Sequence, residues 1–555
     1  MFKTAAVFSN NCVLQRNKNI DIFGWCDSDV TVTVTLSKNG KVLAENTSST
    51  KASGKETKWI VTLPAQKAET DCELSVKCGD YTKTFSDVAI GEVWLCGGQS
   101  NMEFELQNCK EAAAALSETK DPNVRFYYTN KIGWKDEAFY KAEENTCWSK
   151  WDSDARKAWS AVGYFFGRKL ASELGCTVGL LGCNWGGTSC SAWMHENYLK
   201  TDNELNTYIE EQIEATKGKS IEEQMKEYDD YLKRDAEWNV RAQKVYAVQP
   251  DIEWNALQEK IGKNEWPGPK SCKNPYRPCG LYDTMLSRVS PYTMKGVIWY
   301  QGESDDHKPN MYAKLFTRMI DNWRTDWNDD TLPFIFVQLT VNRYKADKDF
   351  KHWCLIREAQ EKVSKTVANT YMTVLMDEGA FNDIHPKQKQ IVGERLEAIA
   401  MKTQYDGKAS NEESFNPTLK SAVSQNGKMI LTFNNAENGF ITKEKPEELA
   451  NLIALEKIQG NEKIGAMVNG KWTGFEIQND KGQWFGALPV FNGNTIEVTS
   501  TEVPEPKACR YNWYNYCPVT VYNKEGLPLA PFRTNKNEKL ITEHAAVQEK
   551  MTVAN

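Results

Sequence analysis

A serine follows two glycines at the end of a predicted buried strand, in the segment WLCGGQSNME of residues 94–103. Glycines let the backbone turn sharply and approach a ligand closely. A serine placed just after them lies above the sheet, near backbone N–H groups that can stabilise an oxyanion. The segment differs from the Gly-x-Ser-x-Gly elbow, because Met102 replaces the second glycine. Ser100 is therefore a candidate nucleophile, and the alternative is a serine that only caps a helix.

Two further segments follow predicted strands. In NWGGTS, residues 184–189, the N–H of Gly186 can face a substrate oxygen, although a plain tight turn also explains the two glycines. In WYQGESD, residues 299–305, Gln301 supplies N–H donors and Glu303 a carboxylate. Loop polarity or helix capping is the alternative for this third segment.

The chain has five histidines, namely His195, His307, His352, His385 and His544. Only His385 precedes a strongly amphipathic segment, with Pro386 suited to the first helical position, so we expect it at a helix entrance above the sheet. A serine nucleophile needs a neutral imidazole to take its proton, and that imidazole needs a partner to fix its tautomer. Asp383 and Glu303 are the candidate partners. His307 lies four residues after Glu303 and can line the same pocket.

The elements that must position these residues alternate between strands and helices over residues 89–410. Short apolar runs predict strands at 93–96, 178–182, 297–300, 334–338 and 372–375. Amphipathic runs predict helices at 155–174, 311–327 and 386–401. Such alternation indicates a parallel sheet covered on both faces, with the ligand site at the carboxyl ends of the strands.

Three other regions have a different character. Residues 1–88 alternate with period two and predict an N-terminal β-sandwich, and residues 411–540 predict a second β-rich domain. Residues 201–265 are charged and helical in pattern, which predicts a helical insertion.

Composition excludes several classes of protein. The chain has 555 residues and a net charge of −7, which argues against a nucleic-acid binder. It has no apolar run of about 18 residues, so no membrane-spanning helix is expected. Its fifteen cysteines are dispersed and lack zinc-ligand spacing, which favours free thiols in a reducing compartment. Its first residues have no signal-peptide core, so we expect a cytoplasmic protein unless a leader was removed.

Four motifs in order resemble those of the SGNH hydrolases, and more closely the sialate O-acetylesterase group and related acetylxylan esterases. They are GQSNM at 98–102, WGGT at 185–188, WYQGES at 299–304 and DIHP at 383–386. The resemblance implies a three-layer α/β/α, flavodoxin-like catalytic domain with β-rich accessory domains at both ends. It implies no metal and no organic cofactor.

The resemblance also implies roles for single residues. Ser100 would be the nucleophile and His385 the base, with an oxyanion hole formed by the N–H groups of Ser100 and Gly186 and by Gln301. The usual acid lies three residues before the histidine, where this chain has Asn382. The orienting acid is therefore open between Asp383 and Glu303.

The implied activity is removal of acetyl groups from O-acetylated sugars through an acetyl-enzyme. Acetylated sialic acid and acetylated xylo-oligosaccharides are both open as substrates, with Trp185 and His307 as candidate contacts. Arg277 is a candidate partner for a sialate carboxylate. A lipid or thioester hydrolase is a weaker alternative. A non-catalytic sugar-binding protein using the aromatic residues 511–516 is another, although burial of those rings in a core or between domains is favoured.

Overall fold

A parallel β-sheet forms the centre of the protein, which we analysed as a computed structural model describing residues 1–249, 252, 254–344, 349–461 and 464–536. Its strand order is β9-β11-β8-β12-β13-β14, with the short β10 antiparallel at the β9 edge. The bounds are β8 (Tyr81–Gly98), β9 (Val124–Tyr128), β10 (Trp148–Ser149), β11 (Val178–Asn184), β12 (Gly296–Tyr300), β13 (Phe334–Gln338) and β14 (Thr370–Val374). Strands β11, β12 and β13 are buried along their whole length, as expected for a sheet covered on both faces.

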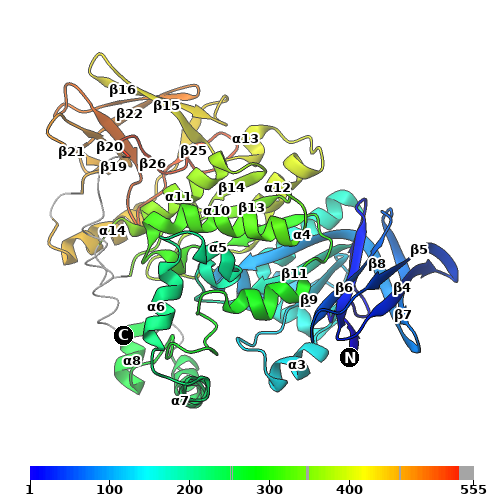
Figure 1. Cartoon of the computed structure of the whole chain (residues 1–555). Helices are drawn as coiled ribbons and strands as arrows, with labels where there is room; N and C mark the ends of the chain where they lie inside the picture. Colours follow the sequence, from blue (N-terminus) through cyan, green and yellow to red (C-terminus); the bar gives the residue numbers. More distant parts are fainter. Residues whose placement is uncertain (250–251, 253, 345–348, 462–463, 537–555) are drawn as a thin grey trace.

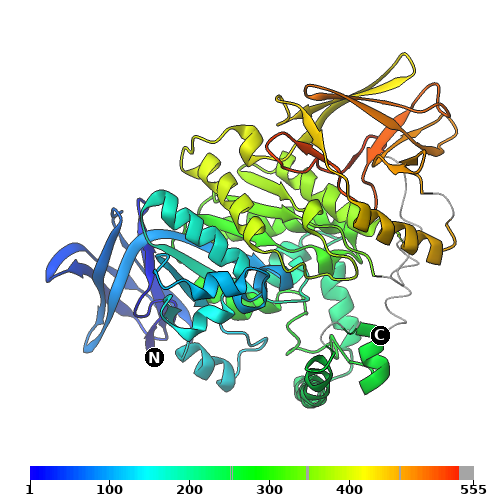
Figure 2. The same ribbon diagram turned by 180° about the vertical axis from the view of Figure 1, so that it is seen from behind.

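Helices cover both faces of this sheet (Figure 1, and from behind Figure 2). Helices α4 (Ala161–Leu174) and α12 (Gln390–Gln404) pack together on one face, where Trp94 of β8 meets Phe166 of α4. Helices α10 (Pro309–Asp326) and α11 (His352–Thr366) lie on the other, where Trp299 of β12 stacks on Phe316 of α10. The expectation of a mixed α/β protein with a large sheet is confirmed.

One helix is shorter than its sequence pattern predicts. The pattern predicts a helix over 155–174, but α4 begins at Ala161. The side chain of Ser160 accepts a hydrogen bond from the Gly163 N–H and so caps the helix there.

The strand β8 belongs to two parts of the molecule at once. Its first half pairs antiparallel with β7 (Glu69–Cys78) in the N-terminal β-rich part, and its second half lies between β11 and β12. The other N-terminal strands are β1 (Phe2–Thr4), β2 (Val13–Gln15), β3 (Ile20–Cys26), β4 (Val30–Lys38), β5 (Lys41–Thr50) and β6 (Thr57–Leu63). The two β-rich ends of the chain lie at opposite ends of the central sheet (Figure 1).

Residues 201–265 contain the helices α6 (Thr207–Ala215), α7 (Ile221–Tyr246) and α8 (Trp254–Ile261). A capping box of Ser220 and Glu223 starts α7. Helices α7 and α8 share a small core of Trp238, Ala242, Val245 and Leu257. Positions 250, 251 and 253 of this segment lie outside the described residues.

The C-terminal β-rich part has its own apolar core, which includes Leu431, Phe475 and Ile496. Its larger sheets are β15 (Thr418–Gln425), β16 (Lys428–Asn434), β23 (Thr495–Thr499) and β22 (Leu488–Asn492), and β21 (Trp484–Gly486), β20 (Phe475–Gln478), β24 (Ala508–Tyr511) and β26 (Phe532–Arg533). Positions 537–540 of the region predicted from sequence lie outside the described residues.

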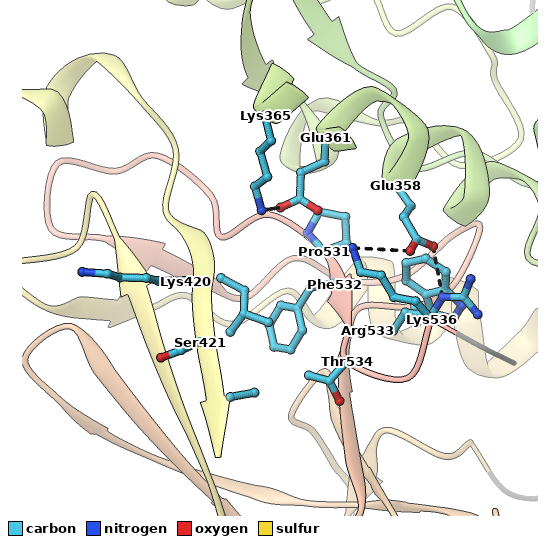
Figure 3. A pocket seen from close by; sticks show the side chains of 13 residues that line it. Glu358, Glu361, Lys365, Lys420, Ser421, Pro531, Phe532, Arg533, Thr534 and Lys536 are labelled. Carbon is cyan, nitrogen blue, oxygen red and sulfur yellow. Dashed lines mark hydrogen bonds and ion pairs between the residues drawn. The ribbon is translucent and has the colours of Figure 1, made fainter. Parts of the chain in front are cut away.

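The C-terminal part meets α11 beside a small surface hollow (Figure 3). There Glu358 of α11 forms ion pairs with Arg533 at 3.0 Å and Lys536 at 3.6 Å. Glu361 forms another with Lys365, 2.7 Å away on the same helix. The charged groups drawn around this hollow thus mostly satisfy one another, and the contact works mainly as an interface.

The guanidinium of Arg357 on α11 fixes the same interface from inside. It is fully buried and donates to the carbonyl oxygens of Leu339, Thr340, Tyr514 and Asn515 at 2.8–3.0 Å. Trp513, beside Tyr514, is buried against Leu355 of α11. The aromatic rings Tyr511, Trp513, Tyr514 and Tyr516 are all buried, so they pack in the protein and do not form a surface for sugars.

All fifteen cysteines are free, and Cys147 alone among them is exposed. The assignment to a reducing compartment stays a prediction. Across the part of the chain that the structure describes, no helix combines the length and the apolarity needed to cross a bilayer.

We expect the Arg357→Leu substitution to lower the free energy of unfolding by about 3–5 kcal/mol, because buried carbonyl oxygens that lose their donor cost about 1–3 kcal/mol each. Chemical denaturation followed by tryptophan fluorescence measures this change. Lys362→Leu, at an exposed position of the same helix, is the control and should change stability by about 0.5 kcal/mol or less. Equal stability of the two variants would contradict the role of Arg357.

Candidate active site

Three of the sequence motifs meet at the carboxyl ends of β8, β11 and β12. Gly98, at the end of β8, lies in register with Asn184 of β11 and with Tyr300 of β12. Gly98 has a φ of +137°, and a Cβ there would lie 2.1 Å from the Tyr300 carbonyl oxygen. Only glycine fits this position, and the tight turn that follows sets the place of Ser100.

The hydroxyl of Ser100 and the imidazole of His385 are in hydrogen-bond contact, with 2.8 Å between Oγ and Nε2. Ser100 is the first residue of the short helix α1 (Ser100–Glu103) after β8, and His385 lies in the loop between β14 and α12. The structure therefore brings together two residues that are 285 positions apart in the sequence. A neutral imidazole in this position can take the serine proton.

The backbone around His385 differs from the sequence prediction. Pro386 does not begin the helix, because α12 starts at Gln390. The carboxylate of Asp383 accepts a hydrogen bond from the backbone N–H of His385 at 2.8 Å and so holds a turn in the loop. His385 consequently lies in a loop one turn before the helix, and not at its entrance.

Neither candidate acid hydrogen-bonds to the imidazole ring among the described residues. Asp383 contacts the backbone of His385, as given above. Glu303 is buried, and its Oε1 accepts from the side-chain amide of Asn101 at 2.7 Å. The orienting acid therefore stays a prediction, open between these two carboxylates.

The side chain of Asn101 connects the serine turn to the histidine loop. Its Nδ2 donates to Glu303 and to the carbonyl oxygen of Ile384, the latter at 3.0 Å. Its Oδ1 accepts from the ammonium of Lys389 at 2.6 Å. Asn101 and Lys389 are both buried, so these bonds are shielded from water.

Burial and this buried cation set the protonation of the site. Burial, and then the charge of Lys389, lower the pKa of His385 below its ordinary value of 6.5. Burial also lowers the pKa of Lys389 to about 8. Burial raises the pKa of Glu303, while its bond to Asn101 and the charge of Lys389 act in the opposite direction. At neutral pH the imidazole is therefore neutral, which is the form that a general base requires.

The predicted oxyanion donor Gly186 lies against Ser100, since a Cβ on Gly186 would lie 3.1 Å from the Cβ of Ser100. Its N–H donates to the carboxylate of Glu103 at 2.6 Å, and Glu103 is in turn ion-paired with Lys131. An anionic oxygen thus already occupies this N–H. A substrate oxygen can use it only after the Glu103 carboxylate has moved away.

Gln301 is fully buried next to the same turn. Its amide nitrogen donates to the Asp305 carboxylate at 2.6 Å and to the Thr188 carbonyl at 3.2 Å. Its oxygen accepts from the Tyr312 hydroxyl at 2.9 Å. Gln301 can donate to a substrate only if one of its two N–H bonds breaks, and here it holds the WGGT turn against the end of β12.

The candidate substrate contacts are spread over a wider area. Trp185 is half-buried in the turn beside Gly186. His307 packs edge-on against Tyr208 of α6, and burial lowers its pKa. Arg277 donates to the Cys272 carbonyl at 2.7 Å and lines a separate hollow together with His195. These contacts connect His307 to the insertion helix α6 and Arg277 to its own segment.

The remaining histidines have structural contacts elsewhere. His195 caps α5 (Glu196–Lys200) by accepting from the Asn197 N–H, and His352 starts α11 and faces Asp306 at 3.4 Å. His544 lies outside the described residues.

Sequence reasoning missed Asn101, Glu103 and Lys389 as parts of the site. Asn101 and Glu103 lie one and three residues after the candidate nucleophile, which was a usable signal. Lys389 carried no such signal, because it falls inside the helix predicted over 386–401.

Comparison with known proteins places the chain in a family. The chain matches the family described as carbohydrate esterase, sialic acid-specific acetylesterase, over residues 90–234 and 265–397. The sialate O-acetylesterase of Mus musculus is 27% identical over 464 residues, covering 78% of this chain and 79% of the mouse protein. That of Homo sapiens is 26% identical and covers 78% of this chain and 76% of the human protein.

A solved structure resembles the whole chain. The crystal structure of a carbohydrate acetylesterase from Xanthomonas citri has a TM-score of 0.69 and 25% sequence identity. The match covers 96% of this chain and 99% of the Xanthomonas chain. The family match spans about half of the chain and contains all four motifs. The chain therefore belongs to the sialic acid-specific acetylesterase family of carbohydrate esterases, and it is a carboxylic ester hydrolase.

Proposed function

We propose that this protein removes acetyl groups from O-acetylated sugars by a serine esterase mechanism in which Ser100 is the nucleophile and His385 the base. The observation that carries the proposal is the 2.8 Å contact between Ser100 Oγ and His385 Nε2 at the carboxyl edge of the sheet. The lowered pKa of His385 supports it, because the ring is then unprotonated at neutral pH. The names of the relatives support an acetylated sugar as substrate.

In the first half of the reaction, Ser100 Oγ forms a bond to the acetyl carbonyl carbon while its proton passes to His385 Nε2. The N–H groups of Ser100 and Gly186 hold the oxyanion once the Glu103 carboxylate has left Gly186. Removal of one such donor costs about 3–4 kcal/mol in comparable sites. The bond to the sugar oxygen then breaks, and His385 returns the proton to the departing hydroxyl. In the second half, water replaces the sugar and releases acetate from Ser100.

The sugar can be a sialic acid or a neutral acetylated sugar such as a xylo-oligosaccharide. The names of the mammalian relatives favour sialic acid. A sialate carboxylate needs a cation, and the candidate Arg277 is engaged with Cys272 and lies near Asp283. This observation keeps a neutral sugar as the second candidate substrate.

We also propose that the central part is an SGNH-type three-layer domain over residues 89–410, with accessory β domains over 1–88 and 411–540 and an insertion over 201–265. The strand order β11-β8-β12-β13-β14 supports this assignment, because it follows the 2-1-3-4-5 order of flavodoxin-like sheets. Strand β9 then adds one strand at the β11 edge.

We expect Ser100→Ala to abolish acetate release from acetylated sialic acid and from acetylated xylo-oligosaccharides, with at least about a 10³-fold fall in kcat, because the acetyl group loses its acceptor. Release is measured with a coupled acetate assay under saturating substrate. If the variant kept its activity, Ser100 would not be the nucleophile. Activity of the parent enzyme on only one of the two sugars identifies the substrate.

The activity should fall as the pH drops through the lowered pKa of His385, since protonation removes the base. We therefore expect the acidic limb of the kcat/KM profile below pH 6.5. In Lys389→Met the buried cation is gone, so the pKa of His385 should rise and the limb should move to higher pH. Lys387→Met, at an exposed position two residues away, is the control and should leave the limb in place. A limb that Lys389→Met leaves unmoved would show that this charge does not act on His385.

Glu303→Gln should lower kcat more than Asp383→Asn does, and the kcat values of the two variants should differ by roughly tenfold or more. Glu303 offsets the buried charge of Lys389 through Asn101, whereas an asparagine at 383 can still accept the backbone N–H of His385. Steady-state kinetics on one acetylated sugar compares them. Small and equal effects would remove both residues as orienting acids.

A further inference from the structure

The indole ring of Trp266, the residue that follows the insertion, lies beside the turn of Gly186 and Gly187. A Cβ on Gly187 would lie 2.7 Å from Cζ2 of Trp266, so the ring packs directly on this glycine. Gly187 follows Gly186, which packs on Ser100 in the same way. Trp266 nevertheless remains 50% exposed. A large aromatic surface is therefore open to solvent near Ser100, and Gly186 and Gly187 lie between the two.

Tyr276 makes a pair with this indole. The two rings are 5.7 Å apart and nearly perpendicular, and Trp266 Nε1 donates to the Tyr276 hydroxyl at 2.9 Å. Tyr276 also touches Gly187, where a Cβ would lie 3.0 Å from its ring. Its hydroxyl oxygen accepts from the indole, so its proton can be donated elsewhere, and no group among the described residues accepts that proton.

Local hydrogen bonds hold the backbone of both aromatic residues in place, and the bond between the two side chains orients the rings. The N–H of Trp266 donates to Asn264 Oδ1 at 2.7 Å, and the N–H of Tyr276 donates to Asn274 Oδ1 at 2.8 Å. The Asn274 amide also donates to the Pro267 and Pro269 carbonyls, which joins the two segments. Rings fixed before binding lose little conformational freedom when a ligand arrives.

The charges next to this pair are already matched. Glu265, beside Trp266, forms a two-pronged ion pair with Arg234 at 2.7–3.1 Å. Glu103 is paired with Lys131. The surface therefore offers a flat apolar face and one hydroxyl donor, which suit a ring that has an apolar face and hydroxyl groups at its rim.

We propose that Trp266 and Tyr276 form a sugar-binding subsite, in which Trp266 stacks on the apolar face of the pyranose ring that carries or adjoins the acetyl group. The Tyr276 hydroxyl donates to an oxygen of that ring. This subsite rests on the proposed function, because it positions the acetyl ester for Ser100. Its ligand is a sugar ring of either source, acetylated sialic acid or an acetylated neutral oligosaccharide.

Kinetics on two kinds of ester test the subsite. Trp266→Ala should raise KM for the acetylated sugar about tenfold, the change that about 1.4 kcal/mol of lost binding produces. It should leave kcat/KM for p-nitrophenyl acetate, which has no sugar ring, within about twofold. Retained activity on that small ester also proves that the variant is folded. Tyr276→Phe keeps the ring and should raise KM less.

Trp254→Ala is the matched control, since Trp254 is a similarly exposed tryptophan, at 47%, on α8 of the insertion. It should leave both KM for the acetylated sugar and kcat/KM for p-nitrophenyl acetate unchanged. An unchanged KM for the sugar in Trp266→Ala, or an equal loss on both esters, would overturn the subsite. Running acetylated sialic acid and acetylated xylo-oligosaccharide in parallel identifies which of the two sugars the subsite takes.

Binding without turnover separates this inference from the proposed function. In the Ser100→Ala background, calorimetry with the acetylated sugar should give a dissociation constant about tenfold weaker once Trp266→Ala is added. If the parent enzyme released no acetate from either sugar, the proposed function would fail. If it released acetate but the double variant bound as tightly as Ser100→Ala, only the subsite would fail.

Discussion

The buried side chain of Asn101 is the interaction on which the rest of the site depends. Its amide group makes hydrogen bonds to the carboxylate of Glu303 after β12, to the Ile384 carbonyl in the loop of His385, and to the ammonium of Lys389. Since Asn101 is the residue after Ser100, Ser100 cannot shift without disturbing these bonds. A buried polar group that loses a partner costs about 1–3 kcal/mol, so the network is stable only when complete. The distance between Ser100 and His385 therefore depends on the buried hydrogen bonds that Asn101 makes with the neighbouring groups.

The site also contains a carboxylate at the position where the proposed mechanism places the developing negative charge. Glu103 occupies the Gly186 N–H that the proposed mechanism assigns to the oxyanion. This contact demonstrates that the N–H is oriented outward from the turn and accessible to an anionic oxygen. It also means that an approaching ester competes with a side chain for the same donor. Lys131, which pairs with Glu103, gives the displaced carboxylate a partner to remain with.

The sequence predicted the site best where a chemically functional residue directly follows a predicted strand. Ser100 and Gly186 could be placed together because both follow short apolar strands, and the carboxyl ends of parallel strands meet at one edge. The loop of His385 was harder, because Pro386 followed by an amphipathic run predicts a helix start, whereas Asp383 holds a turn and the helix begins at Gln390. The positions of Lys389 and Trp266 could not be predicted, since each depends on a long-range contact, with Asn101 and Gly187, that leaves no local pattern in the sequence.

The course of β8 has a consequence for how the protein can be divided. This strand starts in the N-terminal β-rich part and ends at Gly98, two residues before Ser100. The match to the family begins at residue 90, inside the same strand. A chain junction placed near residue 88 would therefore interrupt a hydrogen-bonded ladder that continues into the central sheet. Strand continuity of this kind couples the N-terminal part mechanically to the sheet that carries Ser100.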